Sequence, residues 1–177
     1  MKKFKNKIIL IGGASGVTKS SFSYELMIKH KIIHKLGSGF IREMAKSFIS
    51  KKKNKNIYTH SFETNLKSPI QNLLLQSIPL KKMFENAINR ANREGTSIII
   101  EGVNIIPGLS EFKNIDKKIL LVVRDEKKHF NLINNNKTHK LRKVNNNYFK
   151  NIRLIQEELI LRAKKHNWKI LDRSNIL

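Results

Sequence analysis

KIILIGGASGVTKSS, running from Lys7 to Ser21, is the stretch that decides the fold of this chain. It begins with four consecutive apolar residues, Ile8 to Ile11, which are typical of a short strand buried on both faces. Glycines then allow the backbone to turn sharply, and Lys19 and Ser20 open a helix. A strand, a glycine-rich loop and Lys-Ser at a helix N-terminus together predict a site for nucleotide phosphates. Backbone amides and the helix dipole favour an anion there, and the lysine reaches the β- and γ-phosphates.

The loop departs from the usual phosphate-binding pattern at one position. Residues Gly13 to Ser20 fit G-x-x-x-x-G-K-[ST], except that Thr18 stands where the second glycine is expected. A β-branched residue at a positive φ would be strained by about 1–2 kcal/mol, and we expect Thr18 to avoid this with a negative φ. A chance glycine-rich turn is the alternative interpretation. The expected nucleotide-binding residues are Gly13, Ala14, Ser15, Gly16, Val17, Thr18, Lys19, Ser20 and Ser21.

Length and composition predict a single domain spanning residues 1–177. The chain has no cysteine, so disulfides and thiolate metal sites are excluded. The apolar part of the N-terminal stretch is too short for a secretory signal, and no run approaches the roughly 18 apolar residues of a membrane helix. We therefore expect a soluble, cytoplasmic protein.

The charge of the chain is strongly basic, with 36 basic and 13 acidic residues and a formal net charge of +23. Such a balance suggests nucleic-acid binding, because neutralisation of phosphates dominates that binding. The lysines are spread along the chain, however, and are not interleaved with aromatic residues as stacking platforms require. We expect a solvated basic surface with at most weak, non-specific affinity for nucleic acids.

Short apolar segments alternate with helical patterns along the chain. The expected strands are residues 8–11, 31–35, 97–100, 118–123 and 168–171. Their alternation with helices predicts a three-layer α/β fold of the P-loop NTPase type, with a mostly parallel five-stranded sheet and helices on both faces. Residues 50–67 are rich in lysine and asparagine and are expected to form an exposed excursion. Ser68-Pro69 predicts a helix start, Pro79 an interruption and Gly95 a helix end.

Three residues are candidates for the chemistry of phosphoryl transfer, which requires mainly positioning and positive charge around the transferred group. Lys19 is expected to supply that charge, and the hydroxyl of Ser20 to bind Mg²⁺. Glu101 follows an apolar strand at the carboxyl edge of the sheet, where it would hold the magnesium shell through water. An exposed carboxylate at a strand end is the alternative for Glu101.

The acceptor side offers weaker candidates. Arg42, on the helix after the second strand, is placed to clamp an anionic acceptor, although a surface arginine fits the same pattern. Residues 125–147 are strongly polar and include Arg142 among several cations. They predict either a lid that covers the phosphates and excludes water or a solvated basic loop. His129 and His139 lie ten positions apart without a third ligand, so a metal hydrolase has little support.

Four segments together resemble the archaeal 2-phosphoglycerate kinases, a family of P-loop kinases. They are LIGGASGVTKSS at Leu10 to Ser21, IREM at Ile41 to Met44, IIIEGVNIIPG at Ile98 to Gly108, and FKNIRLIQEELILRA at Phe149 to Ala163. The segments follow the family's order and span most of the chain. The resemblance implies ATP with Mg²⁺ and transfer of the γ-phosphoryl group to the free hydroxyl of 2-phosphoglycerate, giving 2,3-bisphosphoglycerate.

By position, the resemblance also implies that Gly13 to Ser20 bind phosphates, Arg42 the acceptor and Glu101 the metal shell, with the basic lid over the transferring group. Thr18 stands where the family usually has glycine. Gly37-Ser38-Gly39 stands where such kinases commonly carry an aspartate near the acceptor hydroxyl. Longer members have an additional N-terminal regulatory domain, so the chain resembles the kinase domain only.

Three functions therefore stay open from the sequence. A kinase of a small phosphorylated metabolite, with ATP and a small anionic substrate as partners, is the first. A nucleic-acid-directed P-loop protein, such as a polynucleotide 5′-kinase, is suggested by the charge of +23. A nucleotide-binding module without catalysis is suggested by Thr18 and Gly39.

Overall fold

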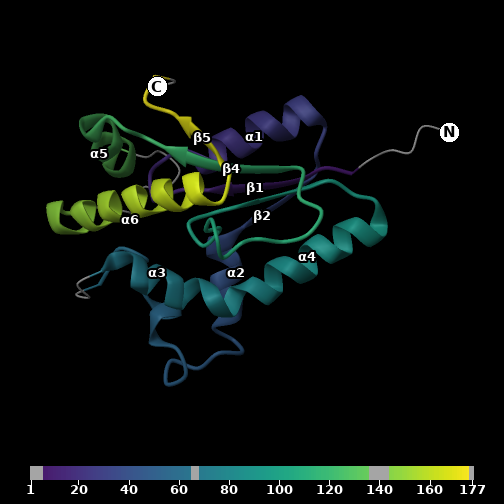
Figure 1. The fold of residues 1–177 in the computed structure, drawn as a ribbon. Helices are drawn as coiled ribbons and strands as arrows, with labels where there is room; N and C mark the ends of the chain where they lie inside the picture. Colours follow the sequence, from purple (N-terminus) through teal and green to yellow (C-terminus); the bar gives the residue numbers. More distant parts are fainter. Residues whose placement is uncertain (1–5, 65–67, 136–143, 176–177) are drawn as a thin grey trace.

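The fold is built around β1 (Ile8–Gly12), the central strand of a five-stranded sheet. The computed structural model describes residues 6–64, 68–135 and 144–175. β1 is buried along its whole length and pairs in parallel with β3 (Ile98–Glu101) and β4 (Lys117–Val122). β2 (His34–Gly37) extends the sheet beyond β3, and β5 (Lys169–Asp172) extends it beyond β4, again in parallel. The order β2-β3-β1-β4-β5 confirms the predicted α/β fold class (Figure 1).

Helices cover both faces of the sheet, as predicted (Figure 1). α1 (Lys19–His30) packs on one face against β1 and β3. On the other face, α4 (Lys81–Glu94) packs against β3, and α6 (Asn146–Lys165) packs against β4 and β5. The smaller elements are α2 (Ser38–Ala45), α3 (Pro69–Ser77), α5 (Glu126–Asn134), and the 3-10 helices η1 (Lys55–Tyr58) and η2 (Ile78–Leu80). Within the described ranges, no helix is long and apolar enough to cross a membrane.

The second strand begins three residues later than predicted. Residues 31–35 were expected to form it, but the observed strand is His34–Gly37. The cause is the end of α1, where Lys31 adopts a left-handed conformation with φ 53°. The N–H of Lys31 donates to the Ile28 carbonyl in the last turn of α1 at 3.3 Å, and the N–H of Ile32 donates to the Met27 carbonyl at 2.9 Å. Lys31 and Ile32 are therefore part of the helix cap and cannot begin the strand.

The connection from the second strand to the second helix is tight. α2 begins at Ser38, directly after β2. Ile41 and Ala45 are buried at helical spacing. Phe48 lies beyond the end of the helix and is exposed.

Residues 50–64 are only in part the exposed excursion that was predicted. Lys51 to Lys53 are exposed, but Ile57 in η1 and Phe62 are buried, and η1 packs against α3. Residues 65–67 lie outside the described residues. The apolar side chains of this segment are therefore packed within the structure, where η1 lies against α3.

The predicted start, break and end of the third and fourth helices are confirmed. Pro69 is the first residue of α3, where its missing N–H costs no hydrogen bond. Pro79 lies in η2, the short 3-10 turn that separates α3 from α4. Gly95 closes α4 with φ 65°, a conformation that glycine adopts without a side-chain clash.

Candidate functional site

The loop between β1 and α1 lies at the carboxyl edge of the sheet, beside the ends of β3 and β4. Gly16, near its tip, has φ 82°, and a Cβ there would collide with the side chain of Ile133 in α5. Glycine is thus required both for the backbone conformation and for the close approach of α5. The loop tip is held against this helix.

All the residues expected to bind the nucleotide lie on this loop or in the first turn of α1. Ala14 and Val17 are fully buried, so they face a ligand only through their backbone. Lys19 is half-buried, while Ser20 and Ser21 are exposed at the start of the helix. The backbone N–H groups of that first turn have no partner within the helix and are available to an anion.

Thr18 differs from its prediction, which was a negative φ. Its backbone has φ 59° and ψ 28°, the left-handed conformation, and it occupies the N-cap position of α1. A β-branched residue is disfavoured there by about 1–2 kcal/mol. Its hydroxyl lies 3.4 Å from Nε of Arg173, which is itself held by Glu25 at 2.7 Å. Thr18 therefore adopts the backbone conformation that glycine would adopt at this position, although it has a β-branched side chain.

Ser20 and Glu101, the two predicted metal-binding residues, are brought together. The hydroxyl of Ser20 donates to Oε1 of Glu101 at 2.9 Å, although the two residues are 81 positions apart. Glu101 is the last residue of β3 and is 7% exposed, so it is not the exposed carboxylate of the alternative interpretation. The described part of the chain has no group of three or more His, Asp or Glu side chains that could hold a metal ion. Two oxygen ligands fit Mg²⁺, which usually keeps several waters and binds one or two protein groups plus phosphates.

A lysine adjoins each member of this pair, since Lys19 precedes Ser20 in the chain and Lys35 lies beside Glu101. Nζ of Lys19 donates to the Ala14 carbonyl at 2.7 Å, within the loop. Nζ of Lys35, on the edge strand β2, lies 3.9 Å from Oε1 of Glu101 and 4.2 Å above the ring of Tyr24. Sequence reasoning missed Lys35, because the pairing of β2 with β3 was not known.

Arg42 is held away from the phosphate loop by other partners. Its Nη1 donates to the Thr59 carbonyl at 2.9 Å, and its Nη2 lies 3.3 Å from Glu43. Nε of Arg42 is buried and has no hydrogen-bond partner in the described part of the chain. The structure thus links Arg42 to the segment before α3 and does not bring it together with Lys19 or Ser20.

Arg142 lies outside the described residues, as do the other cations between positions 136 and 143. The described beginning of that polar segment is helical. Asp125 caps α5 by accepting from the N–H of Lys128 at 2.9 Å. Asn145 caps α6 in the same way through the N–H of Tyr148 at 2.8 Å. The lid therefore stays a prediction.

His129 is the clearest feature of the site that sequence reasoning missed. It lies on α5, is fully buried, and its Nε2 is 2.7 Å from the Ser15 carbonyl in the loop between β1 and α1. Its Nδ1 is 3.3 Å from Nη1 of Arg153 on α6. Burial, together with the charges of Arg153 and Lys19, lowers the pKa of His129 from 6.5 to about 4, although the hydrogen bond to Ser15 raises it. The only local signal was a histidine among polar residues, since its partner is 114 positions away.

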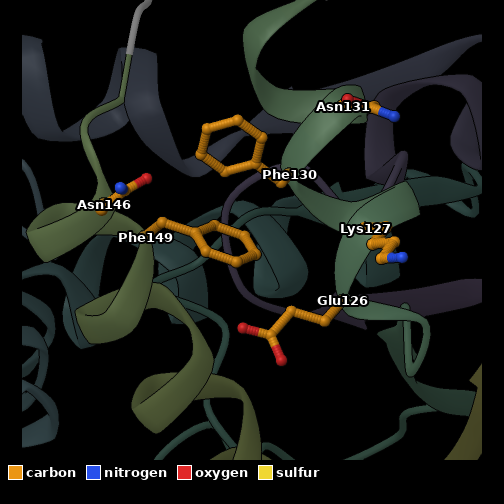
Figure 2. A pocket seen from close by; sticks show the side chains of 6 residues that line it. All are labelled: Glu126, Lys127, Phe130, Asn131, Asn146 and Phe149. Atoms are coloured by element: carbon orange, nitrogen blue, oxygen red, sulfur yellow. The ribbon is translucent and has the colours of Figure 1, made fainter.

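A separate pocket lies between α5 and the beginning of α6, next to this histidine. Its lining residues are Glu126, Lys127, Phe130, Asn131, Asn146 and Phe149 (Figure 2). The ring of Phe149 packs edge-on against Phe130 at 5.1 Å and against His129 at 5.5 Å. The pocket contains none of Lys19, Ser20 or Glu101, so it is not where the predicted chemistry would take place.

The chain is similar over nearly its whole length to curated archaeal proteins named 2-phosphoglycerate kinase. The protein of Methanothermobacter thermautotrophicus is 29% identical over 190 residues, which cover 96% of this chain and 61% of that relative. The protein of Methanopyrus kandleri is 29% identical, and the match covers 96% of this chain and 57% of that relative. The protein of Methanocaldococcus jannaschii is 27% identical, and the match covers 96% of this chain and 59% of that relative. These likenesses confirm the resemblance noted in the sequence. The chain spans about three fifths of the length of these relatives.

Two further comparisons add little. No family model matches the chain. Among solved structures, an uncharacterized protein from Eubacterium ventriosum is 15% identical with a TM-score of 0.42, covering 92% of this chain and 76% of that one. Likeness at this level carries no argument about function.

Proposed function

We propose that this protein transfers the γ-phosphoryl group of ATP, with Mg²⁺, to the hydroxyl of a small phosphorylated metabolite. The preferred acceptor is 2-phosphoglycerate, which would yield 2,3-bisphosphoglycerate and ADP. The observation that carries the proposal is the 2.9 Å hydrogen bond between Ser20 and Glu101 at the carboxyl edge of a parallel sheet. A chance glycine-rich turn would not require a carboxylate from a neighbouring strand to meet the serine after the lysine.

The roles of the residues follow from their positions. Backbone N–H groups of the loop and of the first turn of α1 hold the phosphates, because they are not used within the helix. Lys19 exchanges its bond to the Ala14 carbonyl for the β- and γ-phosphates. Ser20 would hold Mg²⁺ through its hydroxyl oxygen, and Glu101 would hold the metal's shell through water. When bound, Mg²⁺ supplies positive charge to the phosphate oxygens.

The transfer itself needs little from a general base, because the transition state of phosphoryl transfer is loose. The bond from the γ-phosphorus to its bridging oxygen breaks as the acceptor hydroxyl attacks in line, and the hydroxyl proton leaves to solvent. The protein's part is to align the two oxygens and to surround the group with cations. Lys19 does so from one side, and Lys35 lies beside Glu101 on the side of β2.

The acceptor is the part of the proposal that depends most on the relatives' names. Arg42 and Arg142 are our candidates for binding the acceptor's anionic groups and the transferring group. Arg42 would exchange its contacts with Thr59 and Glu43 for contacts with the acceptor. Its Nε, which has no hydrogen-bond partner among the described residues, offers a further donor. A phosphorylated carboxylic acid presents two anions, which matches the cationic character of this edge.

An acceptor screen with γ-labelled ATP tests the proposed function. The wild-type protein is incubated with 2-phosphoglycerate, 3-phosphoglycerate, glycerate, nucleosides and 5′-hydroxyl oligonucleotides, and Lys19→Ala serves as the matched control. We expect label in 2,3-bisphosphoglycerate with the wild type alone. Transfer to the oligonucleotide in preference to all small acids would establish the polynucleotide kinase instead. Binding of ATP without transfer to any acceptor would establish the non-catalytic module.

A further inference from the structure

His129 is a fully buried titratable side chain for which the proposed chemistry has no use. It reaches from α5 to the phosphate loop, and Gly16, the residue after its partner Ser15, has no side chain to keep α5 at a distance. Ile133, one turn further along α5, covers Gly16 directly. The imidazole thus stands where the loop and two helices meet.

The partners of the imidazole determine its tautomer. The Ser15 carbonyl oxygen can only accept, so Nε2 of His129 carries the proton and donates at 2.7 Å. The guanidinium of Arg153 can only donate, so Nδ1 of His129 accepts at 3.3 Å. Arg153 is itself fixed by the carbonyls of Val123 at 2.7 Å and Arg124 at 3.1 Å. The ring is therefore a neutral bridge between α6 and the loop.

The bond to Ser15 determines the direction of a loop N–H group. In a trans peptide the C=O and the N–H point in opposite directions, and Ser15 C=O shares its peptide with Gly16 N–H. With the carbonyl held by α5, the Gly16 N–H points away from α5. Glycine with φ 82° can rotate easily, so the Ser15–Gly16 peptide is a place where the loop could flip. His129 removes that freedom.

We propose that His129 is a positioning residue of the phosphate loop, which holds the Ser15–Gly16 peptide so that the Gly16 N–H is presented to the anionic ligand. The inference rests on the proposed function, because it takes the ligand to be the phosphate chain of ATP. Arg153 supports this role, because its hydrogen bond to Nδ1 selects the tautomer of His129 that donates to Ser15. The charged groups that face the imidazole are Arg153 and Lys19, and Glu157 lies 3.8 Å from Arg153.

The tautomer is tested directly in the wild-type protein, without ligand. Two-dimensional ¹H–¹⁵N spectra of the histidine rings distinguish a protonated Nε2 from a protonated Nδ1 and from the doubly protonated ring. We expect His129 as the neutral Nε2–H form throughout pH 5.5–8. A His129 ring that carries its proton on Nδ1, or that becomes charged above pH 5.5, overturns the inference.

The effect on the loop is tested by calorimetric titration of Mg-ATP into four proteins. His129→Leu fills the space without a donor, and we expect its Kd to rise about tenfold or more, because one oriented donor to an anion is lost. His129→Gln keeps a donor at the corresponding distance from the backbone, and its Kd should stay within about threefold of the wild type. His34→Leu removes an exposed histidine on β2 and should leave Kd unchanged.

The outcomes separate the inference from the proposed function. A wild-type protein that does not bind Mg-ATP overturns the proposed function and the inference with it. A wild type that binds, together with a His129→Leu protein that binds equally well, overturns the inference alone. Circular dichroism on the His129→Leu and His129→Gln proteins checks that both are folded at the temperature of the titration. A His129→Gln protein that loses as much affinity as His129→Leu also contradicts the positioning role, because the donor is then of no consequence.

Discussion

The two halves of the carboxyl edge of the sheet differ in how completely the site is built. On the nucleotide half, the loop after β1, the first turn of α1 and Glu101 of β3 meet through a 2.9 Å hydrogen bond. On the half proposed to bind the acceptor, Arg42 contacts Thr59 and Glu43 and, among the described residues, makes no hydrogen bond or ion pair with the loop. Binding of phosphates uses local backbone geometry, whereas binding of a small acid needs side chains from distant segments. Under the proposed function, the half that binds the nucleotide is therefore already assembled, whereas the half that binds the acceptor must rearrange.

The largest effect is expected at Lys19. Lys19→Ala removes the cation closest to the transferred group, so transfer should fall by about a thousandfold or more, which corresponds to roughly 4 kcal/mol. Single-turnover transfer with labelled ATP measures this. The same change removes the hydrogen bond from Lys19 to the Ala14 carbonyl, so the melting temperature without ligand should fall modestly. Retention of more than a tenth of the wild-type rate would contradict the role of Lys19.

The next effect concerns His129 and the stability of the nucleotide half at low pH. A histidine whose pKa is about 4 in the folded state and 6.5 when unfolded binds protons preferentially in the unfolded state between these values. Stability is therefore lost as the pH falls from 6.5 towards 4, by about 3 kcal/mol at most. Urea unfolding at pH 7, 6, 5.5 and 5 measures this slope.

The matched variant for this slope is His129→Gln, which does not titrate. The lowered pKa values of Glu43, Glu111 and Asp172 make those carboxyls lose stability as well, but only at lower pH, as each is protonated below its ordinary value. The pKa of His30 is also lowered, so His30 contributes to the slope between pH 6.5 and 5 in both proteins, and the difference between the two slopes isolates His129. Parallel slopes for the two proteins in this interval would show that His129 is not kept neutral by the fold.

A smaller effect, on stability, is expected from substitutions of Thr18. Because its φ is 59°, Thr18→Gly should be more stable than Thr18→Ala by about 1 kcal/mol, since only glycine adopts this conformation without a steric penalty. Thermal unfolding of the two variants measures the difference. Equal melting temperatures would mean that the position is not held in the left-handed conformation in solution.

Gly39 gives the smallest effect and probes the acceptor half. A Cβ at Gly39 would meet no atom within 4 Å, so an aspartate fits without displacement. In the first turn of α2, its charge should stabilise the protein by up to about 1 kcal/mol, because the N-terminus of a helix favours an anion. If this position adjoins the acceptor hydroxyl, Gly39→Asp should also change kcat for transfer and leave the Kd of Mg-ATP unchanged. A changed Kd with unchanged kcat would assign the position to the nucleotide half.

Elements determined by nearby residues could be predicted from the sequence. β1 and α1 lie where they were expected, because an apolar run, glycines and Lys-Ser follow each other without a gap. Pro79 and Gly95 act through their own backbone properties, and both were placed correctly. The pairing of Ser20 with Glu101 was also predictable, since both follow strands whose carboxyl ends must meet at one edge of a parallel sheet.

The features that failed depend on partners far along the chain. Residues 31–35 were assigned to β2 because Ile32 and Ile33 are apolar, but the helix cap takes up Lys31 and Ile32. Thr18 has a positive φ although its residue type disfavours one, because the loop geometry overrides the local preference. The role of His129 depends on Ser15, 114 positions away, and on Arg153. No local pattern contains that information.

The measurement that tests the central claim most directly is the Mg²⁺ dependence of ATP affinity, in the wild type and in Glu101→Gln. The claim is that the phosphate loop, Ser20 and Glu101 form a site for Mg-ATP. A glutamine keeps the shape and can still accept from Ser20, but it lacks the charge that holds the metal's waters. We expect Mg²⁺ to strengthen ATP binding by the wild type about tenfold or more and to leave the affinity of Glu101→Gln nearly unchanged. Equal enhancement by Mg²⁺ in both proteins, or none in the wild type, would contradict the account.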